Sequence, residues 1–217
     1  KLPVVTYNGA FVVNPVDGGV IDFNIMERDE ITEIMHLIIE SGLMPLVYSM
    51  VKGVEKVSWI EGKESLGIKN YLAARKNDKR LNPVKGFNEL LTREIFYVSV
   101  IGKEIDERAV EPELINKNIN YHIVRDTYNM DEFWLEIYRH DSTKKDGMNK
   151  VKKITGADNI ISFGDNLNDI PMFEASDRCY AVSNASDELK NYATGIIGSN
   201  DEDSVAMFIE NDFTGGK

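Results

Sequence analysis

Apolar residues recur at two spacings along this chain, and each spacing predicts a different kind of element. Between residues 27 and 41 they follow one face of a helix, and Gly42 stands where a left-handed residue would end that helix. Further strands are expected at 44–51, 55–62, 94–102, YHIV and FWLEIYRH, and further helices near 68–76 and 106–118. The first part of the chain is therefore predicted to be a compact mixture of helices and strands.

The two ends of the chain show different patterns. The N-terminal run LPVVTYNGAFVV predicts strand, turn and strand, because Asn8 and Gly9 adopt positive φ at low cost. After His140, helical and strand-like segments alternate strictly through KDGMNKVKKITG, NIISF, CYAV, SDELKNYA and TGIIG. Such alternation predicts a parallel sheet with helices on its faces. A domain boundary is accordingly expected near His140.

Composition and charge narrow the choice of partner. The chain has 217 residues, 42% of them hydrophobic, and a formal charge of −11. With a sequence pI near 4.8 and no basic cluster, nucleic acid is not an expected partner. The apolar runs are too short for a membrane span. The single cysteine, Cys179, excludes an intrachain disulfide and fits a reducing compartment, so we expect a cytoplasmic protein that binds a small ligand or a metal.

The segment ISFGDNLNDIPMF places two carboxylates directly after a predicted strand. Asp165 and Asp169 lie four residues apart, near the carboxyl end of NIISF, where open α/β sheets form their functional crevice. Mg²⁺ prefers such hard oxygen ligands, whereas Leu167, Ile170 and Ser176 would occupy key positions of an EF-hand and exclude that motif. The alternative is that both aspartates only cap the following helix.

A lysine upstream favours the functional interpretation. Lys144, in STKKDGMNKV, is expected to follow the strand FWLEIYRH and to begin the next helix, so that two strand ends of one sheet present a lysine and an aspartate to one crevice. Together with TYNGA, FGDNLNDIPMF and AVSNASDELKNYATGIIGSNDEDSVAMFI, this pattern resembles the haloacid dehalogenase superfamily, in particular its Cof-type sugar-phosphate-phosphatase-like branch. The resemblance spans nearly the whole chain.

The resemblance implies a fold and a set of residue roles. The fold would be α/β: a Rossmann-like core with a parallel sheet, formed by residues 1–19 and 131–217, and an inserted α/β cap at 20–130. Asp165 would bind Mg²⁺, and Asp169 would hold the metal or a metal-bound water. Lys144 would neutralise the phosphate and the nucleophile, and Asn168 would contact the phosphoryl group. Asn8 is expected to have a structural role in the turn that leads to the cap.

One part of the superfamily pattern has no counterpart in this chain. The nucleophilic aspartate of a D-x-D-G-T loop should end the first, central strand, yet Asp17, Asp22 and Asp29 all lack that context. Two βα units of about 30 residues each would carry the loop, so we expect roughly sixty residues to precede Lys1 in the whole protein. The core sheet should then show a gap between the strand at Val4 and the strand at Ile160.

The resemblance also implies an activity. We expect a Mg²⁺-dependent phosphatase for small phosphorylated metabolites, first of all sugar phosphates, acting through an aspartyl-phosphate; these 217 residues alone would be inactive. A non-catalytic phosphate-binding or regulatory protein is the main alternative, and phosphomutase chemistry is a third. The cap residues Tyr48, Trp59, Arg93 and Tyr97 are candidates for substrate selection, although aromatic residues on strands more often belong to the core. The oligomeric state and the substrate are left open.

Overall fold

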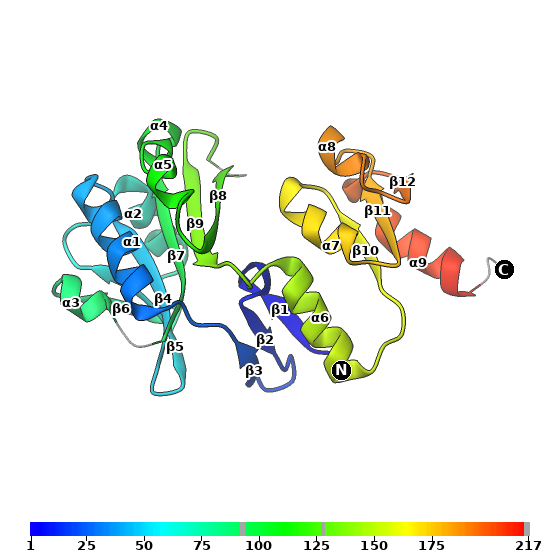
Figure 1. The fold of residues 1–217 in the computed structure, drawn as a ribbon, viewed down its shortest axis with the longest axis horizontal. Coiled ribbons are helices and arrows are strands. Elements are labelled where there is room, and N and C mark those ends of the chain that lie inside the picture. The colour runs from blue at the N-terminus through cyan, green and yellow to red at the C-terminus, as the bar shows by residue number, and fades with distance from the viewer. Residues whose placement is uncertain (92–93, 127–128, 215–217) are drawn as a thin grey trace. The chain divides into compact units, whose positions relative to one another are not determined.

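The computed structural model describes residues 1–91, 94–126 and 129–214, and its main-chain contacts divide the chain into two compact units (Figure 1). Unit 1 comprises Lys1–Asp22 and Ser142–Lys217, and unit 2 comprises Phe23–Asp141. The candidate residue Arg93 lies outside the described residues. None of the helices in the described part of the chain combines the length and apolar character that crossing a bilayer would need.

Each unit has its own sheets and helices. The strands of the first are β1 (Val4–Thr6), β2 (Phe11–Val13), β3 (Val20–Phe23), β10 (Ile161–Gly164), β11 (Arg178–Val182) and β12 (Gly195–Ile197). Its helices are α6 (Lys144–Thr155), α7 (Ile170–Glu174), α8 (Asp187–Lys190) and α9 (Ser204–Thr214). The strands of unit 2 are β4 (Pro45–Val51), β5 (Val54–Ile60), β6 (Leu81–Val84), β7 (Ile95–Gly102), β8 (Ile119–Arg125) and β9 (Phe133–Arg139). Its helices are α1 (Arg28–Glu40), α2 (Leu66–Ala74), α3 (Phe87–Leu90), α4 (Glu104–Arg108) and α5 (Glu111–Leu114).

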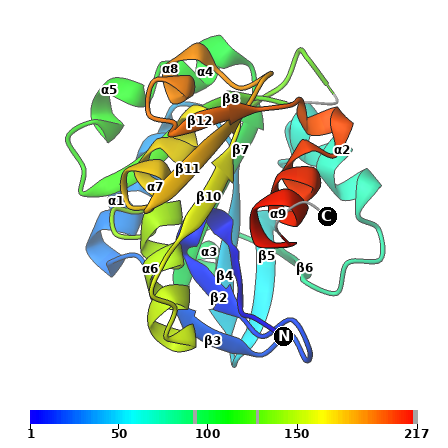
Figure 2. The same ribbon diagram turned by 90° about the vertical axis from the view of Figure 1, so that its right-hand side faces the viewer.

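The C-terminal part of unit 1 contains the predicted parallel sheet. Strand β11 pairs in parallel with both β10 and β12. Figure 2 shows α6 and α7 on one side of β10 and α9 on the other. Phe208 of α9 covers the sheet, with ring centroids 5.5 Å from Phe163 and 4.2 Å from Tyr180. The prediction of a parallel sheet with helices on both faces is confirmed.

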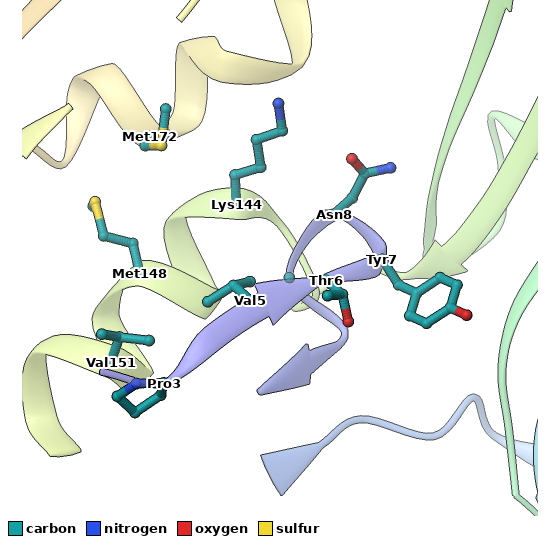
Figure 3. Close-up of a pocket in the computed structure, with 10 residues that line it drawn as sticks. Pro3, Val5, Thr6, Tyr7, Asn8, Lys144, Met148, Val151 and Met172 are labelled. Atoms are coloured by element: carbon teal, nitrogen blue, oxygen red, sulfur yellow. The ribbon is translucent and has the colours of Figure 1, made fainter. Parts of the chain in front are cut away.

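A gap separates the two sheets of unit 1. Strand β1 pairs antiparallel with β2 in a sheet of order β1-β2-β3, whereas β10 lies at the edge of the parallel sheet. Next to β1 is a cavity of about 450 Å³, and much of its lining is apolar (Figure 3). The apolar side chains that line it include Val5, Met148, Val151 and Met172. The predicted gap between the strands at Val4 and Ile160 is thus confirmed.

Unit 2 is built on one mixed sheet of order β6-β5-β4-β7-β9-β8. The apolar face of α1, with Ile34 and Ile38 fully buried, packs on this sheet. Each such buried aliphatic side chain contributes about 1.5–3 kcal/mol. Strand β9 is antiparallel to β7 and β8, so the expectation that FWLEIYRH and NIISF belong to one sheet is wrong. The alternating residues Leu135 and Ile137 bury their side chains in the core of unit 2.

The boundary between the two units falls between Asp141 and Ser142, close to the position expected near His140. The cap was expected to end at residue 130, but the strand pairing includes 131–141 in unit 2. The helix expected at 106–118 is likewise divided into α4 and α5. Pro112, in the first turn of α5, explains the break, because proline lacks the N–H that a continuous helix would need there.

Helix α4 carries a buried carboxyl group, that of Glu107. Glu107 is 0% exposed, and neither of its oxygens has a hydrogen-bond partner of normal geometry among the described residues. Burial raises the pKa of Glu107 to about 8, and the backbone N–H groups of Gly102 and Leu135 offset only part of that effect. As the pH rises, the unfolded chain releases this proton near the ordinary pKa of 4.5, whereas the native state keeps it up to a higher pH.

The Glu107 proton makes the stability of unit 2 depend on pH. Because the native pKa is raised, its contribution to stability is complete below about pH 4.5 and is lost as the pH rises through about 8. We expect the free energy of unfolding to fall across that range by a few kcal/mol, on the order of 1.4 kcal/mol per pH unit. Glu107→Gln should remove this slope, whereas Glu113→Gln, at an exposed carboxyl, should keep it. Urea unfolding followed by tryptophan fluorescence measures the free energy of unfolding at each pH, since Trp59 and Trp134 both lie in unit 2. If the free energy of unfolding changed equally with pH in the wild type and both variants, the role of Glu107 would be contradicted.

Candidate active site

Lys144 is the first residue of α6, as predicted. The helix begins there because Thr143 caps it: the Asp146 N–H donates to Thr143 Oγ1 at 3.3 Å. In return the Thr143 N–H donates to Asp146 Oδ2 at 2.9 Å, which completes a capping box. The sequence signal for this start is a threonine followed three residues later by an acid, just before an amphipathic run.

Two glycines fix the first turn of α6 against the N-terminal strands. A side chain at Gly9 would overlap the carbonyl group of Thr143, and one at Gly147 would overlap Val5. Gly9 also has a φ of 118°, which side-chain-bearing residues rarely adopt. The close backbone approach therefore requires glycine at both positions and sets where Lys144 lies. Neither contact could be read from the sequence alone, since each joins positions more than a hundred residues apart.

The acidic loop begins where β10 ends at Gly164. Asp169 is 3% exposed, and its Oδ2 accepts the backbone N–H groups of Asp165 at 3.0 Å and Asn166 at 3.3 Å. The Asn166 side chain accepts the Leu167 N–H at 2.8 Å and also the Asp169 N–H, and the latter bond together with the Asn166 N–H bond to Asp169 forms a capping box. Asp169 thus holds the turn at Leu167–Asp169, but its side chain makes no capping hydrogen bond to the following helix α7, which was the alternative raised by the sequence. Asn166 was missed as a contributor, although an asparagine before a helical turn is a common cap.

Lys144 and the acidic loop meet through side-chain contacts. Lys144 Nζ forms an ion pair with Asp169 Oδ1 and donates to Asn168 Oδ1 at 3.2 Å. The lysine side chain is 31% exposed, so its ammonium group faces partly to solvent while the aspartate below is buried. Three of the four predicted site residues, Lys144, Asn168 and Asp169, are therefore brought together from two segments of unit 1.

Asp165 differs from Asp169 in its surroundings. Its side chain is exposed and accepts no hydrogen bond within the described residues, whereas its backbone carbonyl accepts the Ser186 N–H at 3.0 Å. Both oxygens of Asp169 already accept donors, so the carboxylate left open to a cation is that of Asp165. The described residues contain no group of three or more His, Cys, Asp or Glu side chains arranged around one metal position. One free carboxylate suits Mg²⁺, which keeps several waters and also binds substrate phosphate.

Comparison with known proteins supports a family assignment. Residues 1–209 match the family of haloacid dehalogenase-like hydrolases. Over 77 residues the chain is 39% identical to the pyridoxal phosphate phosphatase YbhA of Escherichia coli, covering 35% of this chain and 28% of that protein. Over 78 residues it is 40% identical to the 5-amino-6-(5-phospho-D-ribitylamino)uracil phosphatase YwtE of Bacillus subtilis, covering 35% and 27% respectively.

Solved structures share the fold. A sugar phosphatase of haloacid dehalogenase subclass IIB superposes with a TM-score of 0.73 at 19% identity, covering 97% of this chain and 75% of that one. The sequence alignments, in contrast, span less than half of the length of the curated relatives. Because the family match extends over almost all of the sequence, the chain belongs to the haloacid dehalogenase-like hydrolases.

Proposed function

We propose that the protein is a Mg²⁺-dependent phosphatase that hydrolyses small phosphorylated metabolites, with sugar phosphates as the first class to test. The observation that carries this proposal is the position of the Lys144 ammonium, which contacts Asn168 and Asp169 of the acidic loop that also carries the exposed Asp165. A fixed cation next to an acidic, cation-accepting loop suits a phosphoryl group, whose equatorial oxygens carry negative charge during transfer.

Each residue has a distinct part in this proposal. Lys144 neutralises the charge of the phosphate and the nucleophile. The Asn168 amide orients the phosphoryl group. Buried Asp169 keeps the lysine and the loop in place through its three accepted hydrogen bonds. Asp165 holds Mg²⁺, which when bound offsets the negative charge of the phosphate.

The proposed reaction needs an aspartate nucleophile, which we assign to none of these 217 residues. No aspartate of the 217 residues lies in a D-x-D-G-T pattern. In the proposed reaction an aspartate oxygen bonds to phosphorus while the ester P–O bond breaks, and the departing alcohol takes up a proton. Water then attacks the phosphorus of the aspartyl-phosphate, which releases inorganic phosphate and restores the carboxylate. We propose that unit 2 is the cap domain that the family resemblance implies.

The relatives support small phosphate monoesters as the substrate class, but they do not single out one substrate. Their names specify a cofactor phosphate in one case and a phosphorylated ribityl compound in the other. Both are small phosphate monoesters, and we extend that class to this protein. The proposed setting is the cytoplasm, where the buried thiol of Cys179 would stay reduced.

A panel of phosphate monoesters tests the proposal. The whole protein should release phosphate with Mg²⁺, lose activity in excess chelator, and regain it when Mg²⁺ is restored. Asp165→Ala should abolish turnover without unfolding the protein, because that side chain is exposed and unbonded. Hydrolysis that is unchanged in Asp165→Ala would contradict the mechanism.

A second candidate function uses the same side chains without catalysis. A phosphate-binding or regulatory protein would use the same lysine and loop without turnover. It would bind phosphorylated ligands in the presence of Mg²⁺ and release no phosphate from any member of the panel. That combination of results would replace the phosphatase proposal.

A further inference from the structure

The turn that follows β1 has an unusual backbone. Three successive residues have positive φ: 52° at Tyr7, 55° at Asn8 and 118° at Gly9. Glycine and asparagine adopt this region readily, but a tyrosine there costs about 1–2 kcal/mol. The turn therefore persists only because its surroundings hold it in this conformation.

The surrounding contacts show how the turn is held. Gly9 lies against the carbonyl of Thr143, and Gly147 of α6 lies against Val5 and Gly9. The Ala10 N–H donates to the Tyr7 carbonyl at 3.0 Å, and the Tyr7 ring meets the Phe11 ring edge to face with centroids 5.8 Å apart. The strained turn and the first turn of α6 thus form one closely packed piece.

This packing gives Asn8 a fixed position relative to Lys144. Both residues line the same cavity. In Figure 3 the Asn8 amide and the Lys144 amine lie at one end of that group of side chains and point in the same direction, whereas Pro3 and Val151 lie at the other end. The strained turn therefore presents a carboxamide beside the cation that is proposed to bind phosphate.

We propose that Asn8 is a further substrate-binding residue, whose carboxamide donates a hydrogen bond to the phosphate monoester held by Lys144. This inference rests on the proposed function and adds to it a group outside the acidic loop. A carboxamide suits the position because it offers N–H donors to phosphate or hydroxyl oxygens without adding charge beside an ammonium already paired with Asp169. The competing explanation is that Asn8 is present only because asparagine tolerates a left-handed backbone.

Two substitutions test these explanations. Asn8→Gly and Asn8→Asp both tolerate the observed φ, and both remove the amide donor. If Asn8 only forms the turn, Asn8→Gly should not affect catalysis, whereas Asn8→Asp adds a negative charge that repels phosphate in either case, so Asn8→Gly decides between the explanations. If Asn8 binds substrate, we expect KM to rise about tenfold in each variant, as for the loss of one hydrogen bond to a charged group, with an unchanged melting temperature. The matched control is Asp203→Gly, at an exposed residue with φ 53° that lies outside the cavity lining, and its KM should equal that of the wild type.

The readouts keep this inference distinct from the phosphatase proposal. If the wild type hydrolyses the panel and Asn8→Gly keeps its KM, the role of Asn8 is overturned while the phosphatase remains. If the wild type hydrolyses nothing, the phosphatase is overturned, and the role of Asn8 is decided by the rise in melting temperature on adding inorganic phosphate with Mg²⁺. A rise that is lost in Asn8→Gly supports substrate binding. An equal rise in both proteins, or none in either, overturns it.

Discussion

Replacing Lys144 by alanine is expected to lower kcat/KM for phosphate monoesters by about a hundredfold or more in the whole protein, the effect typical of losing one fixed electrostatic group in a transition state. The lysine is the cation that contacts both Asn168 and Asp169. Alanine at the first position of α6 keeps the helix, since Thr143 still provides the cap. The loss should therefore appear in steady-state kinetics while the circular dichroism spectrum is retained.

Lys145 provides the matched control. It follows Lys144 directly and has the same charge, but it is exposed on α6 and forms no ion pair within the described residues. Lys145→Ala should leave kcat/KM within about twofold of the wild type. Equal losses of kcat/KM in the two variants would show that catalysis depends on positive charge at the start of α6 in general and not on the contacts of Lys144.

Replacing Asp169 by asparagine is expected to destabilise unit 1 by about 2 kcal/mol and to lower activity as well. The buried carboxylate accepts the Lys144 ammonium and two backbone N–H groups. An asparagine has one acceptor oxygen in place of two, so either the lysine or the backbone amides must lose a partner. Amide hydrogen exchange of β10 and α6 measures the change, because faster exchange reports local opening.

Asp165→Asn is the control for the stability effect. Asp165 lies in the same loop, but its exposed side chain accepts no hydrogen bond within the described residues. Its replacement should leave hydrogen exchange of β10 unchanged even though Mg²⁺-dependent activity falls. If the amide hydrogens of β10 and α6 exchanged no faster in Asp169→Asn than in Asp165→Asn, the structural role assigned to Asp169 would be refuted.

The features that the sequence predicted correctly are those determined by local patterns. The alternation of helices and short apolar runs after His140 predicted the parallel pairing of β10, β11 and β12, because segments of this kind pair only through helical crossovers. The helix from Arg28 to Glu40 follows from its apolar spacing, and Gly42 has the expected positive φ of 78°. The sequence likewise predicted correctly that Lys144 is the first residue of a helix.

The features that were missed depend on partners distant in sequence. The alternation in β9 shows that one face is buried, but it does not reveal that Tyr138 pairs with Tyr97 of β7, in the sheet of unit 2 and not in the sheet that contains β10. The meeting of Lys144 with the acidic loop was expected, but the direct ion pair with Asp169, 25 positions away, was not, because it depends on how α6 packs. The left-handed conformation of Tyr7 opposes the intrinsic preference of tyrosine, so only tertiary packing could determine it.

The most direct test of the site is a double-mutant cycle of Lys144→Ala and Asp169→Asn, with free energies of opening taken from hydrogen exchange of β10 and α6. If the ammonium and the buried carboxylate stabilise each other as the structure shows, the double variant should lose at least 1 kcal/mol less than the sum of the two single losses, a coupling of about the size seen for contacting residues. Losses that add to within about 0.5 kcal/mol would mean that the two side chains act independently, and would contradict the account.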